Sequence, residues 1–227
     1  MNYLTVVLFA GIAALPALVW LIFFLKEDVH PEPRKLIIYS FFICALATIP
    51  ALLFQILARN LTGDNPSLSS FIIFALIEET FKFLAAFYAV SKNKFFDEPI
   101  DAMIYMIVIA SGFATVENIL ITASSLGSIS SLVVYGALNV LLLRFVGATL
   151  LHVLSSGIIG YAWAKSLANE THRGPVFGAI IIATLIHAAF NYIVAAAPQN
   201  NLFYSSSILI AAAFFVLNDF EILKKKN

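Results

Sequence analysis

Three ionisable side chains lie at the centre of a stretch that is otherwise as apolar as a membrane helix. Within SLSSFIIFALIEETFKFLAAFYAV these residues are Glu78, Glu79 and Lys82. On a helix, a lysine three or four positions after a glutamate lies on the same face, so Lys82 can reach either carboxylate. Ionisable groups inside membrane spans are costly, and by default they face a bundle interior and serve a function. We therefore expect a functional site around these residues.

Further polar residues interrupt the next three apolar stretches of the chain. They are Glu117 with Asn118, Arg144 with His152, and His187 with Asn191. With neutral histidines, the three glutamates face only Lys82 and Arg144, which leaves one surplus negative charge. Such a cluster should either hold a proton on one glutamate or hold a cation.

The composition excludes an ordinary soluble protein. The 227 residues are 61% hydrophobic and 11% charged, and the mean hydropathy is +0.95. These values predict an all-α, polytopic transmembrane bundle that forms one domain over residues 1–227, with a catalytic core at about 68–196. The first apolar stretch lacks a basic region before it and is too long for a signal peptide, so we expect a retained helix.

Seven apolar runs predict seven membrane spans. They cover residues 3–25, 36–57, 68–90, 100–122, 132–166, 175–196 and 203–222. The fifth run is long enough for two helices, or for a lead-in that ends near Asn139 followed by one span. Cytoplasmic loops collect lysine and arginine, and seven spans place ten basic loop residues on one side and only Arg59 on the other. We therefore expect a multi-pass protein of the cell membrane with its N-terminus outside and its C-terminus in the cytoplasm.

Several of the polar residues also have a structural explanation. Lys82 is better read as the neutralising partner of the glutamates than as a catalytic group. Asn118 could simply join two helices by hydrogen bonding, and Asp101 is placed to start a helix or to act as a counter-ion. The acids are different, because a buried ion pair is a poor source of stability and needs only one acid for each base.

The motifs together resemble those of the PrsW-type intramembrane proteases. IEETFKF, from Ile77 to Phe83, resembles that family's EExxK motif. Asp101 and Tyr105 followed by GFATVENI look like its D…Y…GFxxxEN segment. Its R…H…G helix and its final HxxxN motif are matched by these residues: Arg144, His152, Gly160, and His187 to Asn191. The four fragments follow the family's order over residues 76–191, so the resemblance implies an intramembrane endopeptidase.

A wider superfamily, the CAAX-processing and bacteriocin-processing endopeptidases, has the pattern EExxxR, FxxxH and HxxxN or HxxxD. The sequence departs from it in two places. Lys82 lies one residue earlier than the arginine, and Glu117 stands where the first histidine would be. Both departures favour the PrsW type over prenyl-protein processing.

Peptide hydrolysis needs an activated water, a stabiliser for the oxyanion and a proton donor for the leaving amine. We assign the general base to Glu78 and expect Glu117 to hold the water with it. His187 and Asn191, one turn apart, can direct donors at one oxyanion. The remaining members of the predicted site orient and complete it: Glu79, Lys82, His152 and the counter-ion Arg144. The sequence has no GxSxG elbow, and Cys44 has no local partner, so we expect no covalent nucleophile.

Another mechanism and another class of function could use the same residues. Zinc could be bound by Glu117, His152 and His187, with Glu78 as base, and the sequence leaves this open beside the metal-free reading. An ion- or proton-coupled transporter could also place such a cluster in a seven-helix bundle. Transporters usually show repeats and helix breaks in matching spans, whereas Pro50 and Pro175 are expected near span ends.

The resemblance implies a single-pass membrane protein as the substrate, such as an anti-sigma factor, cut near the outer face of the bilayer. The expected partners are this substrate and the lipid bilayer, and we expect no nucleic acid. At 1.5 Å per residue, the expected depths of the polar residues overlap. Carboxylate oxygens of Glu78 and Glu117 and ring nitrogens of His152 and His187 should therefore lie within about 8 Å of one another, close enough to share a water or a metal.

Overall fold

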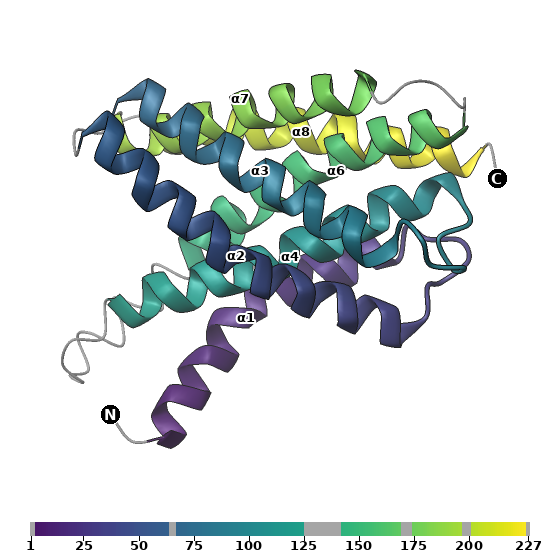
Figure 1. The fold of residues 1–227 in the computed structure, drawn as a ribbon, viewed down its shortest axis with the longest axis horizontal. Coiled ribbons are helices and arrows are strands. Elements are labelled where there is room, and N and C mark those ends of the chain that lie inside the picture. The colour runs from purple at the N-terminus through teal and green to yellow at the C-terminus, as the bar shows by residue number, and fades with distance from the viewer. Residues whose placement is uncertain (1–2, 64–66, 125–141, 169–173, 197–200, 226–227) are drawn as a thin grey trace.

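Seven α-helices make up the part of the chain that the computed structural model describes, which is residues 3–63, 67–124, 142–168, 174–196 and 201–225 (Figure 1). No strand occurs among these residues. The predicted all-α class is confirmed. The helices are α1 (Tyr3–Leu25), α2 (Arg34–Thr62), α3 (Leu68–Val90), α4 (Pro99–Ser124), α6 (Ala148–Ala168), α7 (Gly174–Ala196) and α8 (Asn201–Lys224).

Five helices contain segments long and apolar enough to cross a membrane: Arg34–Asn60, Pro99–Ala123, Leu142–Ala168, Gly174–Ala196 and Leu202–Lys224. In α1 the apolar segment is shorter, Ala10–Leu25. Helix α3 is not among these five. Its 23 residues exceed the roughly 20 that a span needs, so its three ionisable residues, and not its length, set it apart. The polytopic helical bundle predicted from composition is thus confirmed.

The loops predicted to share one side of the membrane do meet at one end of the bundle. His30 Nδ1 lies 2.7 Å from Glu98 Oε1, which joins the loop before α2 to the loop before α4. Lys224 Nζ at the end of α8 lies 2.5 Å from Glu27 Oε2. We call this the basic end, because it carries Lys26, Arg34, Lys35, Lys92, Lys94, Lys165 and Lys224. Figure 1 shows it at the right.

The long fifth run is described only in its second part. Residues 142–146 are helical, Gly147 forms a turn, and α6 follows. Residues 132–141, including the expected lead-in near Asn139, lie outside the described residues, as do Arg173, Lys226 and the loop residue His172.

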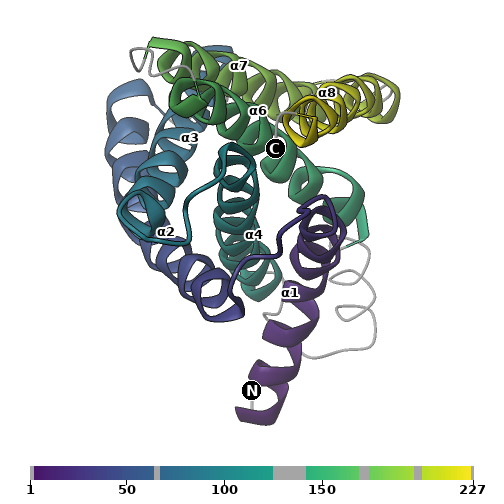
Figure 2. The ribbon, with the colours of Figure 1, turned by 90° about the vertical axis from the view of Figure 1, so that its right-hand side faces the viewer.

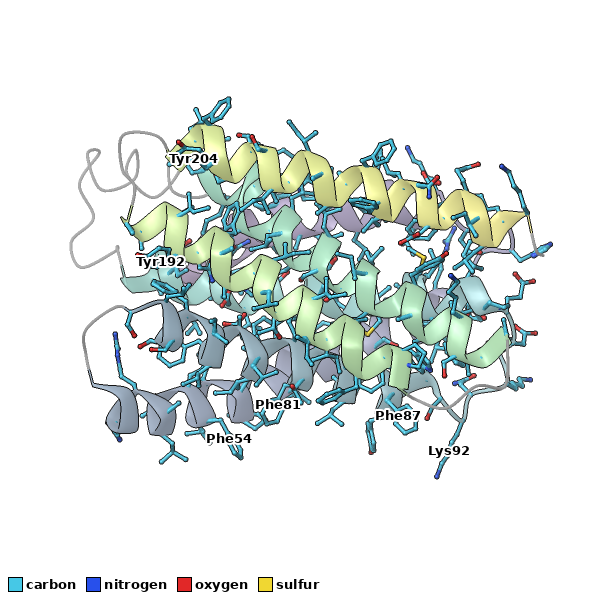
Figure 3. The ribbon with its side chains drawn as sticks, turned by 90° about the horizontal axis from the view of Figure 1, so that it is seen from above. Phe54, Phe81, Phe87, Lys92, Tyr192 and Tyr204 are labelled. Atoms are coloured by element: carbon cyan, nitrogen blue, oxygen red, sulfur yellow. The ribbon has the colours of Figure 1, made fainter. Side chains whose placement is uncertain are left out.

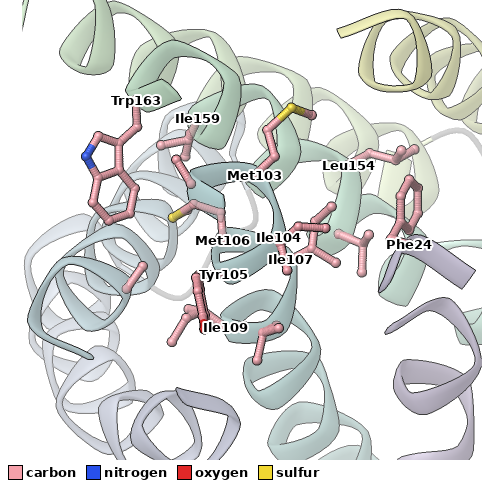
Figure 4. Close-up of a cluster of buried hydrophobic side chains, with 14 of the residues drawn as sticks. Phe24, Met103, Ile104, Tyr105, Met106, Ile107, Ile109, Leu154, Ile159 and Trp163 are labelled. Atoms are coloured by element: carbon pink, nitrogen blue, oxygen red, sulfur yellow. The ribbon is translucent and has the colours of Figure 1, made fainter. Parts of the chain in front are cut away.

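Helix α4 is the centre of the bundle (Figure 2). It packs most extensively against α6 and also contacts α1, α2, α3 and α8. Every side chain from Ile100 to Thr115 is buried. Figure 4 shows α4 residues such as Met103 and Ile107 beside Leu154 and Ile159 of α6 and Phe24 of α1. A helix that is apolar all round belongs in such a core.

Two glycines allow α4 to lie close to its neighbours. A Cβ at Gly112 of α4 would lie 2.3 Å from the carbonyl oxygen of Phe41 on α2. A Cβ at Gly160 of α6 would lie 2.6 Å from Cα of Met103 on α4. Small residues at helix contacts let backbones approach in membrane bundles. Both contacts bring together helices that carry residues of the predicted site.

Asp101 starts α4, which confirms one of its two predicted roles. Its Oδ2 accepts hydrogen bonds from the backbone N–H groups of Asp97 and Glu98, at 3.0 and 2.8 Å. An acid in the first turn that bonds back to the residue before the helix, with Pro99 at the first helical position, caps the N-terminus.

The expectation that Pro50 lies near the end of a span is wrong. The second helix continues to Thr62, so Pro50 lies well inside it, and Pro16 lies inside α1. The apolar run ended earlier than the helix because Arg59 and Asn60 are polar, yet they remain helical. Proline within a helix removes one backbone hydrogen bond.

Candidate active site

Four helices bring the predicted polar residues into one buried cluster. Glu78, Glu79 and Lys82 come from α3, Glu117 from α4, His152 from α6 and His187 from α7. The exposed fractions of the buried members do not exceed 6%. Glu117 is more accessible, with 21% of its side chain exposed. The cluster therefore meets solvent mainly on the Glu117 side.

Glu79 is held in place by three donors that converge on one oxygen. Its Oε1 lies 2.6 Å from Lys82 Nζ, 2.8 Å from His187 Nδ1 and 3.0 Å from Ser155 Oγ. The predicted role of Lys82 as neutralising partner of a glutamate is confirmed, and the glutamate is Glu79. The contact with His187 requires that its Nδ1 carry the hydrogen, because an ionised carboxylate can only accept.

His152 is oriented in the same way by Glu117. The Nε2 atom lies 2.8 Å from Glu117 Oε2, and that oxygen also accepts from Arg144 Nη2 at 3.0 Å. On the other side of the ring, Lys82 Nζ lies 3.3 Å from Nδ1. An ammonium group has donors only, so Nδ1 presents its lone pair and the hydrogen is on Nε2.

Glu78 lies where the two histidine rings meet. Gln55 of α2 donates from Nε2 to Glu78 Oε1 at 2.7 Å. The other oxygen, Oε2, is buried and has no hydrogen-bond partner among the described residues. It lies 3.6 Å from His187 Nε2 and 3.9 Å from His152 Nδ1. Nε2 of His187 and Nδ1 of His152 therefore face one orphaned carboxylate oxygen, and Nδ1 of His152 also accepts from Lys82. A metal ion at this point would take the place of Lys82 as the partner of His152 Nδ1.

This donor set fits a divalent metal ion. One ligand atom from each of Glu78, His152 and His187 lies within 4.8 Å of the other two. Two histidines and one carboxylate, with a further position open, is a set found at catalytic zinc. The second nitrogen of each histidine is bonded to a carboxylate, Glu79 or Glu117, as metal-bound histidines usually require. The zinc alternative considered from the sequence differs, because it used Glu117, which lies behind His152, in place of Glu78.

The expected proximity of the four polar groups is observed for the measured pairs. Their separations run from 2.8 to 3.9 Å, well within 8 Å. The ring centroids of His152 and His187 are 4.9 Å apart, with the rings nearly perpendicular. His187 thus points into the bundle and towards Glu78.

Asn118 has the structural role that the sequence allowed. It donates from Nδ2 to the backbone oxygen of Ala13 at 3.2 Å and to Thr149 Oγ1 at 3.3 Å. Its Oδ1 accepts from Arg144 Nε at 2.5 Å. Asn118 therefore joins α1 and α6 to α4 and positions the arginine that holds Glu117.

One predicted member is not drawn into this hydrogen-bond network. Asn191 is half-buried on α7, and its side chain bonds to none of the described residues. Two residues that contact the glutamates were not predicted, namely Gln55 and Ser155. Gln55 left a detectable signal, since it is the only amide side chain in the apolar run 36–57. Ser155 left none, because small hydroxyl residues are common in membrane helices.

Comparison with known proteins identifies a family of metalloproteases, which agrees with a donor set that fits a metal ion. The model of the PrsW family intramembrane metalloproteases matches residues 32–218. The match includes every residue of the cluster.

Curated relatives cover most of the chain. Protease PrsW of Oceanobacillus iheyensis is 28% identical over 190 residues, which are 83% of this chain and 82% of the relative. Protease PrsW of Geobacillus kaustophilus is 26% identical over 176 residues, 77% and 73% of the two chains. Protease PrsW of Bacillus subtilis is 26% identical over 180 residues, 77% and 76%. No solved structure matches significantly.

Proposed function

The chain belongs to the PrsW family of intramembrane metalloproteases, and from this premise we propose that it hydrolyses a peptide bond of a membrane protein at the cluster of Glu78, His152 and His187. One observation carries the proposal. Each histidine is bonded to a carboxylate through one nitrogen and turns the other towards Glu78 Oε2, at 3.6 and 3.9 Å. Glu79 Oε2 also lacks a partner, but only Glu78 Oε2 lies where a nitrogen of each histidine converges on it.

Glu78, His152 and His187 would hold a divalent cation such as zinc. When bound, the ion would supply a Lewis acid that polarises the scissile carbonyl and makes a bound water acidic. Lys82, close to His152, would keep positive charge near the reacting groups, and Glu79 would neutralise part of it.

Glu117 holds the outer side of His152 and keeps one oxygen uncommitted. Both of its contacts, with Arg144 and His152, use Oε2. Its other oxygen bonds to no described residue, and the side chain is 21% exposed. Glu117 would therefore orient His152 and exchange protons with water through Oε1, whereas Glu78 Oε2 faces the reacting groups. Asn191, whose amide is likewise uncommitted, can donate to the developing oxyanion.

The same atoms also support a metal-free reaction. In that case Glu78 Oε2 is the base that takes a proton from water, and the two histidines stabilise the charges that develop. This second candidate rests on the same orphaned oxygen. The two differ in whether a cation is required.

The predicted topology supports a depth of cleavage, and the family resemblance supports a class of substrate. Glu78 lies ten residues after the first residue of α3, Leu68, which is about 15 Å at the helical rise. With the basic end in the cytoplasm, the cluster would lie in the middle to outer part of the bilayer. We propose a single-pass membrane substrate, such as an anti-sigma factor, cut near the outer side.

The test is cleavage of a co-expressed candidate substrate by the wild type and by Glu78→Gln, together with metal analysis of both purified proteins. We expect the variant to fold, to remain in the membrane and to lose cleavage, because Gln keeps the size but neither ligates well nor accepts a proton. Glu221→Gln, at an exposed position on α8, is the matched control and should cleave normally.

Metal content separates the two candidates. One bound ion in the wild type, lost together with activity in Glu78→Gln or on chelation, supports the metal-dependent reaction. Full activity of a metal-free preparation in chelator would favour Glu78 as base. Retention of more than a few per cent of activity by Glu78→Gln would contradict both.

A further inference from the structure

A second site lies at the basic end, remote from the active-site cluster. It is a cavity of about 520 Å³ between the end of α3, the loop before α4 and the end of α6. Its volume lies in the range of small-ligand sites. Helical rise places it about 12 Å along α3 from Glu79, since Phe87 in its wall comes eight residues later. The cavity does not belong to the proteolytic site.

Three aromatic rings form the wall of this cavity. Trp163 of α6 lies with its ring centroid 4.8 Å from that of Phe96 and 6.1 Å from that of Phe87. Figure 4 shows the indole nitrogen on the side of the Trp163 ring that faces away from Met103 and Ile159. Aromatic faces attract cations and also accept apolar groups.

Trp163 also brings a polar group to the cavity that nothing in the described protein satisfies. The side chain is only 4% exposed, yet its indole N–H donates to no residue that the structure describes. The nitrogen itself is not one of the fully buried atoms without a partner, so it is accessible to a ligand. The other tryptophan, Trp20, does donate, to the backbone oxygen of Phe145 at 2.7 Å. The open donor of Trp163 points to an acceptor on a ligand.

The rim of the cavity carries both signs of charge. Lys92 is exposed and forms no ion pair with a described residue. Figure 3 shows Phe87 and Lys92 at the same end of the molecule. Asp97 is exposed as well, and its carboxylate accepts no hydrogen bond from the described part of the chain. The two opposite charges line one cavity and do not pair with each other, so a ligand with both signs can satisfy both.

Further carboxylates favour an ammonium group beside Asp97. One oxygen each of Asp97, Glu32 and Asp101 lies within 4.8 Å of the other two. Glu98, also in the wall, is paired with His30. Asp97 therefore has carboxyl groups beside it that can accept hydrogen bonds from an ammonium group, and Lys92 is the basic residue that lines the cavity.

We propose that this cavity binds the headgroup of a phospholipid that carries both a phosphate and a primary ammonium, as in phosphatidylethanolamine. The phosphate accepts from the Trp163 indole N–H and pairs with Lys92. The ammonium donates to Asp97 and lies against the aromatic wall. The source is the bilayer, because the cavity opens where α3 and α6 end and α4 begins, at the level at which lipid headgroups meet a spanning protein.

The experiment uses the fluorescence of Trp163. The chain has two tryptophans, so in a Trp20→Phe background Trp163 is the only one. The purified full chain in detergent is titrated with short-chain phosphatidylethanolamine, phosphatidylglycerol and phosphatidylcholine, and the emission of Trp163 is followed. We expect saturable binding of the ethanolamine lipid, about fivefold tighter than either of the others, as for one partly exposed ion pair.

Matched variants test the charges. Lys92→Gln and Asp97→Asn should each weaken binding of the ethanolamine lipid about fivefold. Lys94→Gln is the control, because Lys94 lies in the same loop but stacks on Phe95 outside the cavity, and it should bind normally. If Trp20→Phe proves unstable, native mass spectrometry of the wild type, Lys92→Gln and Lys94→Gln with the same lipids gives the comparison.

Three results would overturn the proposal. Equal binding of phosphatidylglycerol or phosphatidylcholine would show that no primary ammonium is recognised. Equal effects of Lys92→Gln and Lys94→Gln would show that the cavity is not the site. Binding of soluble glycerophosphoethanolamine as tight as that of the lipid would assign the cavity to a soluble ligand instead of the bilayer.

Discussion

His187 Nδ1 lies 2.8 Å from Glu79 Oε1, although the two residues are 108 positions apart in the chain. Both side chains are almost completely buried. The contact fixes the hydrogen on Nδ1 and so turns the lone pair of Nε2 towards Glu78, 3.6 Å away. Glu79 therefore orients His187, whereas Glu78 Oε2 faces the remaining nitrogens of both histidines.

Removal of the Glu79 charge should destabilise the fold. Glu79→Gln leaves Lys82 as an uncompensated buried charge, and loss of one partner of a buried pair costs about 3–5 kcal/mol. The double variant Glu79→Gln with Lys82→Met should recover most of this stability, because both charges are gone. Thermal unfolding in detergent measures the change.

Cleavage separates positioning from stability in the same variants. The double variant should stay well below wild-type activity even though it is folded, because His187 has lost the carboxylate that orients it. Wild-type cleavage by the double variant would show that Glu79 serves stability alone.

The close approach of α4 to α2 predicts an asymmetry between two glycines. Gly112→Ala places a Cβ against the backbone oxygen of Phe41, at 2.3 Å before any shift, and should cost about 1–3 kcal/mol. Gly178→Ala on α7 meets nothing within 4 Å and should be neutral or stabilising, because alanine favours a helix. Thermal unfolding of both variants checks this, and equal effects would refute the packing at Gly112.

Stability should depend on pH through Glu32 in the loop before α2. Burial raises the pKa of Glu32 from 4.5 to about 8, despite the hydrogen bond donated by Tyr105, and the negative charges of Asp101 and Asp28 add to the increase. Between about pH 4.5 and pH 8 the folded protein therefore binds more protons at Glu32 than the unfolded chain does. Stability should fall as the pH rises through this window.

Glu32→Gln is the variant that isolates this effect. It should have a flatter dependence of the unfolding temperature on pH between 5 and 8.5 and should be at least as stable as the wild type at the upper end. If the unfolding temperature of Glu32→Gln fell more steeply with pH than that of the wild type, other titrating groups would dominate the pH dependence of stability.

The charge pattern of the loops predicts the orientation. A reporter fused after Asn227 should behave as cytoplasmic, because the basic end collects the lysines and arginines that cytoplasmic loops favour. Reporter activity on the outer side would reverse the predicted orientation of the chain in the membrane and, with it, the proposed depth of the active site.

Much of the candidate site could be predicted from sequence because membrane burial makes polar residues conspicuous. Glu78, Glu79, Lys82 and Glu117 stand out from apolar surroundings, and the cost of charge in a bilayer places them in the bundle interior. The all-α class followed from hydropathy in the same way. Ser155 is different, because a hydroxyl that can bond within its own helix leaves no such signal.

The tertiary structure alone decided which contacts each carboxylate makes. Glu78 and Glu79 are adjacent in sequence and both could pair with Lys82, since spacings of three and four residues are equivalent on one helix. The packing of α7 and α6 against α3 brought His187 and Ser155 to Glu79 and left Glu78 Oε2 without a partner. It also put Glu117 behind His152 and not beside His187. A sequence shows which residues must be buried together, but the rotation of each helix about its axis depends on contacts between residues far apart in the chain, and this rotation determines which atoms meet.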